Sequence, residues 1–193
     1  MYTQEYEFTA VHEAGHAICI AQFPPANTAL TSLAISYPEI LSPRLIEIEI
    51  WYDKERERFD GRTPYSPYGL NDEQLLFIAL GGLVAELMAR ADRNCDTTAI
   101  QKQVFSGRLD DTKDMEDIRR YLDRLSKDRP REEISTSMIS YMCSALERNW
   151  ELVLQIATEL LSKCDPETHE GMILYDEFSS ETQARLKRLR DKR

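Results

Sequence analysis

The sequence lacks the features that mark several large classes of protein. It contains no apolar run approaching the roughly 18 residues of a membrane-spanning helix, no GxxxxGK[ST] loop for nucleotide phosphates and no CxxC pair. Positive charge is also scarce, because 24 Lys and Arg stand against 34 Asp and Glu, for a net charge of -10 at pH 7. We therefore expect no membrane span and no binding to nucleic acid or anionic lipid.

Length and composition indicate a single folding unit. The chain has 193 residues, of which 42% are hydrophobic and 30% charged, as is typical of a soluble globular protein. We expect one domain spanning residues 1–193. Its cysteines, Cys19, Cys95, Cys143 and Cys164, are far apart and follow no cleavable N-terminal signal. This pattern predicts reduced thiols and a cytoplasmic location.

Hydrophobic periodicity predicts a mainly α-helical protein with a small β-sheet of two or three strands. Helices are expected over residues 5–22, 72–88 with Asn71 as the N-cap, about 110–125, 132–163 as one long helix or a kinked pair, and 180–190 with Ser179 or Ser180 as the cap. The pattern of residues 93–105 is ambiguous and allows a short helix from Thr97 or Thr98. Strands are expected over residues 30–37 and 45–51. The second alternates Ile with Glu, as a half-solvated antiparallel or edge strand does. Residues 53–69 are predicted to form a long surface loop.

The clearest chemical motif lies within the first predicted helix, where residues 12–17 are His-Glu-Ala-Gly-His-Ala. Positions four apart share one helix face, so His12 and His16 can bind one zinc ion at about 2.0–2.1 Å. Glu13 can address a water on that zinc without being a ligand. Because zinc lowers the pKa of bound water from 15.7 toward about 7, Glu13 can act as the general base. The HExxH motif therefore predicts a protease.

A catalytic zinc keeps one coordination position open, so the sequence must supply a third protein ligand. The candidates are His169, Glu86, Asp96, Asp110, Asp111 and Asp114. No histidine follows at the HExxHxxGxxH spacing, which excludes that subclass of zincins. Spacing alone leaves Asp110, Asp111 and Glu86 nearly equal. For His169, which follows Asp165 and Pro166, we expect a turn on the surface.

Several segments resemble the protease domain of the FtsH type of ATP-dependent zinc metalloproteases. Residues 12–17 are identical to the HEAGHA motif of that family, and residues 80–86, LGGLVAE, are similar to its LGGRAAEE helix. Residues 106–111, SGRLDD, are similar to its TGASND segment, whose last Asp binds zinc. The resemblance implies that Asp111 is the third zinc ligand. It also implies that Glu86 supports a zinc histidine from outside the ligand set.

The resemblance implies a zincin-like helical metalloprotease domain with Zn2+ held by His12, His16 and Asp111, and with Glu13 as the catalytic residue. The sequence contains no ATPase module, so the chain is expected to act as an ATP-independent endopeptidase on flexible protein or peptide substrates. A separate ATPase partner would be needed to unfold other substrates, and the family implies a homo-oligomer. A substrate could add as a strand along an edge such as residues 30–37.

The alternative function is that of a noncatalytic adaptor or assembly subunit, which keeps the fold and a structural metal but cleaves nothing. A structural zinc is normally closed by a fourth protein ligand. The sequence offers no convincing fourth ligand, which favours the enzyme.

Overall fold

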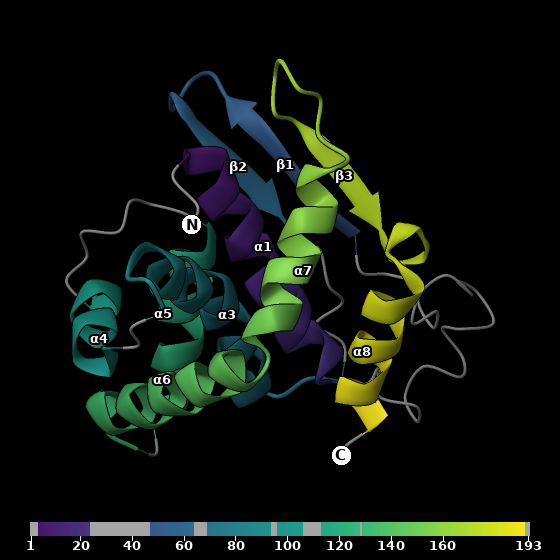
Figure 1. The fold of residues 1–193 in the computed structure, drawn as a ribbon. Helices are drawn as coiled ribbons and strands as arrows, with labels where there is room; N and C mark the ends of the chain where they lie inside the picture. The colour runs from purple at the N-terminus through teal and green to yellow at the C-terminus, as the bar shows by residue number, and fades with distance from the viewer. Residues whose placement is uncertain are drawn as a thin grey trace, which may run out of the picture.

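The computed structural model describes residues 4–23, 47–63, 69–93, 96–105, 113–127 and 129–191. Within these ranges the chain is mainly helical, with a small antiparallel sheet at one end (Figure 1). The helices are α1 (Glu5–Ala21), α3 (Asp72–Arg90), α4 (Thr97–Phe105), α5 (Lys113–Leu125), α6 (Arg131–Arg148), α7 (Trp150–Leu161), the 3-10 helix η2 (Tyr175–Glu177) and α8 (Ser180–Asp191). The strands are β1 (Glu47–Asp53), β2 (Arg58–Arg62) and β3 (Gly171–Leu174).

The helix with the HExxH motif lies at the centre of the molecule, between α3, α7 and the sheet (Figure 1). The predicted start and end of α1 are confirmed to within one residue. Small side chains allow α1 and α3 to cross closely, since a Cβ atom on Gly15 would lie 2.5 Å from the carbonyl oxygen of Gly81. This crossing brings the histidine face of α1 against α3. The N-cap of α3 is also as predicted, because the Asn71 side chain accepts a hydrogen bond from the Gln74 N–H.

The sheet has the strand order β2-β1-β3, and both pairs are antiparallel. Ile48 and Ile50 are buried against the helices, which confirms the alternation that predicted β1. Of the two alternatives predicted for this strand, the structure shows the antiparallel one, since β1 is the central strand of the described sheet and is antiparallel to both neighbours. The predicted loop 53–69 is wrong in part, because it contains β2. That strand, RFDGR, has no apolar alternation and is held by pairing with β1, while the short β3 was not predicted. The predicted strand 30–37 lies outside the described residues.

The remaining helices follow the sequence prediction closely. Residues 132–163 form a pair, α6 and α7, that separates at Asn149. Helix α4 begins at Thr97, and the described part of the next helix, α5, begins at Lys113. Ser179 caps α8, since its hydroxyl oxygen accepts a hydrogen bond from the Thr182 N–H. Helical periodicity was therefore a reliable guide to this part of the chain.

The described cysteines differ in state. Cys19 and Cys164 are free thiols, and burial raises the pKa of the Cys19 thiol. Cys143 is disulfide-bonded, so the prediction that every thiol is reduced is wrong for this residue. Pairing between distant cysteines cannot be deduced from their spacing.

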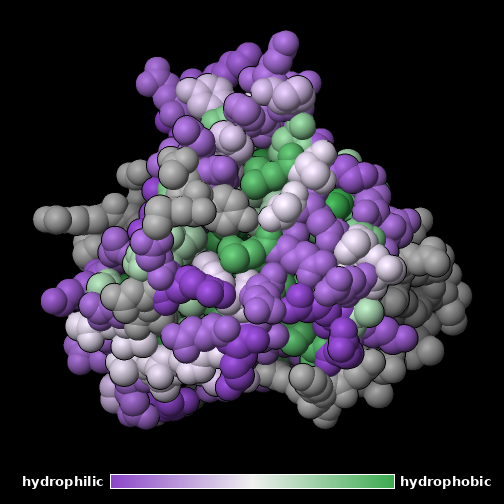
Figure 2. Space-filling model, viewed as in Figure 1, coloured by the Kyte–Doolittle hydropathy of each residue, from purple (hydrophilic) through white to green (hydrophobic). Residues whose placement is uncertain are grey.

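The surface carries much of the chain's charge. The face in Figure 2 is mostly hydrophilic, with smaller hydrophobic areas between the hydrophilic residues. Among the described residues, the large apolar side chains most exposed are Tyr52, Tyr141, Met172 and Leu174. No helix in the described ranges is both long enough and apolar enough to cross a membrane.

Candidate metal centre

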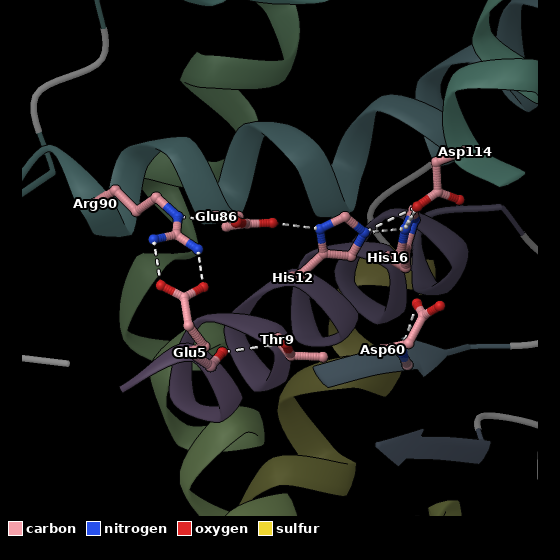
Figure 3. Close-up of polar contacts among 9 residues, drawn as sticks. Glu5, Thr9, His12, His16, Asp60, Glu86, Arg90 and Asp114 are labelled. Atoms are coloured by element: carbon pink, nitrogen blue, oxygen red, sulfur yellow. Dashed lines mark hydrogen bonds and ion pairs between the residues drawn. The ribbon is translucent and has the colours of Figure 1, made fainter. Parts of the chain in front are cut away.

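The two histidines of the motif lie side by side on α1, one helical turn apart, as their spacing predicted (Figure 3). The Nε2 atoms of His12 and His16 are 3.1 Å apart, and the ring centroids are 4.9 Å apart. Both side chains are largely enclosed, with 17% of His12 and 8% of His16 exposed. The pair therefore presents two nitrogen atoms to one small region at the side of α3.

Hydrogen bonds at the other ring nitrogens fix the orientation of both imidazoles. His12 Nδ1 lies 3.0 Å from Glu86 Oε2, and His16 Nδ1 lies 2.8 Å from the carbonyl oxygen of Ile78. The Ile78 carbonyl and an ionised Glu86 carboxylate can only accept, so in each neutral imidazole Nδ1 carries the proton. The lone pair on each Nε2 then points into the shared region, which is the arrangement that a metal requires.

Asp114, at the start of α5, supplies the third group. Its Oδ2 atom lies 2.9 Å from His12 Nε2 and 3.3 Å from His16 Nε2 (Figure 3). The three side chains form a group in which all the candidate ligand atoms lie within 4.8 Å of one another. Among the described residues this is the group of His, Cys, Asp or Glu that could hold a metal ion.

The other candidates for the third ligand have different positions. Asp110 and Asp111 lie outside the described residues. Asp96 caps α4, where its Oδ1 accepts hydrogen bonds from backbone N–H groups of that helix. His169 is half-buried in a turn with φ 58 and stacks on Tyr6, with ring centroids 4.1 Å apart. Glu86 contacts the outer nitrogen of His12 and so supports the ring instead of joining the ligand atoms.

The separations within this group suit a tetrahedral cation. Zinc bound at about 2.0–2.1 Å places neighbouring ligand atoms about 3.4 Å apart in a tetrahedron. The distances of 2.9, 3.1 and 3.3 Å between the three ligand atoms are a few tenths of an ångström shorter. Two nitrogen lone pairs and a carboxylate at these distances repel one another unless a proton or a metal ion lies between them. The donor set therefore fits a divalent metal.

The electrostatics of the group favour a cation. Burial acts to lower the pKa of His12, but hydrogen bonds to Asp114 and Glu86 outweigh it and raise that pKa well above its ordinary value. Burial acts to lower the pKa of His16 as well, but the charge of Asp114 and its hydrogen bond to the ring together outweigh burial and raise that pKa. Conversely, burial acts to raise the pKa of Asp114, but the two histidines hold it far below its usual range. A bound metal would take the place of these protons.

Gly82 on α3 makes room for the imidazoles. A Cβ atom at this position would lie 2.3 Å from His16 Nε2 and 2.4 Å from His12 Cδ2. Contacts this short do not occur, so any side chain here would push both rings away from their positions. The second glycine of the LGG sequence is therefore required by the positions of the two imidazoles.

Glu13 lies against β2, close enough to His12, His16 and Asp114 for their charges to affect it. It is 3% exposed, and the Thr63 hydroxyl donates a hydrogen bond of 2.7 Å to its Oε2. A Cβ atom on Gly61 would lie 2.7 Å from Glu13 Oε1, so a glycine is needed there as well. Burial raises the pKa of Glu13 above its ordinary value. The contact with Thr63 was missed because that residue is 50 positions away, in a predicted loop.

Comparison with protein-family models, curated proteins and solved structures found no match. The family resemblance of the short sequence segments therefore stays a prediction. The functional inference depends on the chemistry of His12, His16 and Asp114 and on the position of Glu13.

Proposed function

We propose that this chain is a zinc-dependent endopeptidase with a zincin-like, FtsH-like peptidase domain. In this proposal His12, His16 and Asp114 hold Zn2+, and Glu13 is the catalytic base. The observation that supports it best is the convergence of two Nε2 lone pairs and one carboxylate oxygen within 3.3 Å. Asp114 replaces Asp111 as the proposed third ligand because its carboxylate reaches both histidines.

The donor set favours zinc in a catalytic rather than a structural site. Imidazole nitrogen and carboxylate oxygen in a tetrahedral arrangement are typical zinc ligands. Three side chains make up the group found among the described residues, and no fourth described side chain joins them. A tetrahedral metal would then keep one position for water or substrate, whereas a structural zinc is normally closed.

The residues around the group have separate roles in peptide hydrolysis. When bound, zinc supplies a Lewis acid that lowers the pKa of water and polarises the scissile carbonyl. Glu86 and the Ile78 carbonyl orient the two imidazoles through their Nδ1 atoms. Glu13 accepts a proton from the attacking water and returns it to the leaving amine. Its raised pKa brings it closer to neutral pH, where such an exchange is efficient.

The edge of strand β2 is the proposed binding site for the substrate. This strand is one of the two outer strands of the described sheet, next to β1, and its Gly61 lies directly against Glu13. An extended peptide that adds to this edge would lie with its backbone beside the base. Flexible or unfolded segments are therefore the expected substrates.

Metal content and proteolysis together test the proposal. The wild type should contain about one zinc per chain by mass spectrometry and should cleave an unfolded casein-like substrate. Glu13→Gln should keep the metal and lose cleavage, and Asp114→Ala should lose both. Asp111→Ala is the matched control, and it should keep both if Asp114 is the ligand.

Two results would contradict the proposal. A wild type that binds no zinc in the absence of chelators would show that the HExxH residues do not form a metal site. A wild type that binds zinc but cleaves nothing, and whose function in the cell is unchanged by Glu13→Gln, would favour the adaptor.

A further inference from the structure

Arg90, at the C-terminal end of α3, connects the metal centre to the start of α1. Its Nε donates a hydrogen bond of 2.9 Å to Glu86 Oε1. Its two terminal nitrogens donate to the Glu5 carboxylate at 3.2 and 2.6 Å, and its guanidinium carbon lies 4.2 Å from the centre of the Phe8 ring. Figure 3 shows the row of contacts from Glu5 through Arg90 and Glu86 to His12.

The row follows a single helix-to-helix contact. On α3, Gly82, Glu86 and Arg90 are spaced by four residues and therefore share one face. On α1, Glu5 and His12 are two turns apart and face α3 in the opposite order along the chain. Because both helices are held together by packing near Gly15, the four polar side chains of Glu5, Arg90, Glu86 and His12 are positioned by one helix-to-helix interface.

Each carboxylate oxygen of Glu86 has its own partner. Oε2 faces His12 Nδ1, whereas Oε1 accepts from Arg90. The Glu86 side chain is 25% exposed, so without a second partner it could rotate toward water and leave His12. The planar guanidinium holds two carboxylates in a fixed fork, and an ammonium group cannot reproduce this geometry. The orientation of the Glu86 carboxylate toward His12 therefore depends on Arg90.

We propose that Arg90 is a positioning residue of the metal centre. It holds Glu86 against His12 Nδ1 so that His12 Nε2 points toward His16 and Asp114, and it thereby increases the affinity for a divalent metal. The inference rests on the proposed function to the extent that these three residues bind a metal. It does not require the chain to be a protease.

Zinc affinity, measured by competition with a chromophoric chelator, tests the role of Arg90 directly. Arg90→Met keeps much of the apolar stem over Phe8 but removes the fork, and should weaken Zn2+ binding about tenfold, at the lower end of the usual range for residues that support a metal ligand. The Zn2+ affinity of Arg90→Lys should lie between those of the wild type and Arg90→Met. The visible absorption of the Co2+ form should change in Arg90→Met as well.

A matched control is Arg185→Met, because Arg185 is another arginine whose guanidinium joins two helices, α7 and α8. It should leave zinc affinity and the Co2+ spectrum unchanged. A double-mutant cycle adds a readout that a merely structural role would not give. If Arg90 acts through Glu86, Arg90→Met should cause little further loss of affinity in a Glu86→Gln background.

The outcomes separate this inference from the proposed function. If the wild type binds neither Zn2+ nor Co2+, both fail. If the wild type binds Zn2+ and Arg90→Met binds it equally well with an unchanged Co2+ spectrum, only the role of Arg90 is disproved. If Arg90→Met does not fold, Arg90→Lys decides the question, and wild-type affinity in that variant would overturn the inference.

Discussion

At residue 82 a single methyl group decides whether the two imidazoles can meet. Alanine normally favours a helix over glycine by about 1 kcal/mol. Gly82→Ala should nevertheless destabilise the fold by about 1–3 kcal/mol, because its Cβ would overlap both rings, and it should weaken zinc binding more than about tenfold. Thermal unfolding and zinc titration measure the two effects. A stabilised variant with unchanged zinc affinity would contradict the geometry of the imidazoles on α3.

Thr63 holds the Glu13 side chain in position. Its hydroxyl holds Glu13 Oε2, and a hydrogen bond of this kind lowers the pKa of the carboxyl. Thr63→Val should reduce kcat of peptide cleavage about tenfold with zinc content unchanged, because the base is no longer fixed in position. Thr63→Ser keeps the hydroxyl and should restore most of the activity. Equal kcat values for the two variants would disprove this role.

Among the elements, one carboxylate on α7 binds the first turn of α8 through several hydrogen bonds. Glu159 on α7 accepts hydrogen bonds from the Ser179 N–H, the Ser179 hydroxyl and the Thr182 hydroxyl. Burial acts to raise the pKa of Glu159, but these hydrogen bonds outweigh it and lower that pKa. The ionised carboxylate therefore holds the first turn of α8 against α7.

The direction of this shift determines how stability depends on pH. A lowered pKa in the folded state contributes stability above the ordinary glutamate value of about 4.3, and that contribution is lost as the pH falls through the folded pKa. Glu159→Gln should therefore lower the free energy of unfolding at pH 7 by about 1 kcal/mol, a modest figure because the site is partly solvated. In acid below the folded pKa the difference should vanish. Urea unfolding at the two pH values checks this, and an equal difference at both would contradict it.

For the whole molecule, the proposed metal ligands come from α1 and α5 and are supported by α3, so metal binding and folding should be linked. In the metal-free protein the raised pKa values of His12 and His16 contribute stability that is complete below about 6.5 and is lost as the pH rises through the folded pKa values. Zinc competes with these protons. As the pH is lowered, the apparent affinity for zinc should therefore begin to fall while the pH is still above 6.5. The loss should reach up to about tenfold per pH unit for each protonated histidine.

Thermal unfolding with and without a chelator, across a range of pH, measures this linkage. At neutral pH, zinc at about one hundred times its Kd should raise the free energy of unfolding by about 2.7 kcal/mol, and the chelator should remove that gain. The gain should shrink as the pH falls. Full zinc occupancy near pH 4, where both histidines of an ordinary site are protonated, would argue against this set of ligands.

The sequence by itself determined the features that depend on near neighbours in the chain. Helical periodicity gives most of the helices, and the spacing of His12 and His16 places both rings on one face, because four residues make about one turn of a helix. The alternation of Ile with Glu gives β1, because successive side chains of a strand point to opposite faces of the sheet. Each of these outcomes depends on local backbone geometry and on hydrophobic pattern alone.

Only the tertiary structure decided which distant groups meet these residues. Asp114 is 102 positions from His12, and Thr63 is 50 positions from Glu13. The signal for Asp114 was weak, namely its place just before Met115, the first buried residue of α5. Strand β2 has no periodic pattern and exists because β1 supplies its backbone partners. Such contacts follow from how the helices and the sheet pack, and sequence spacing does not encode packing between elements far apart in the chain.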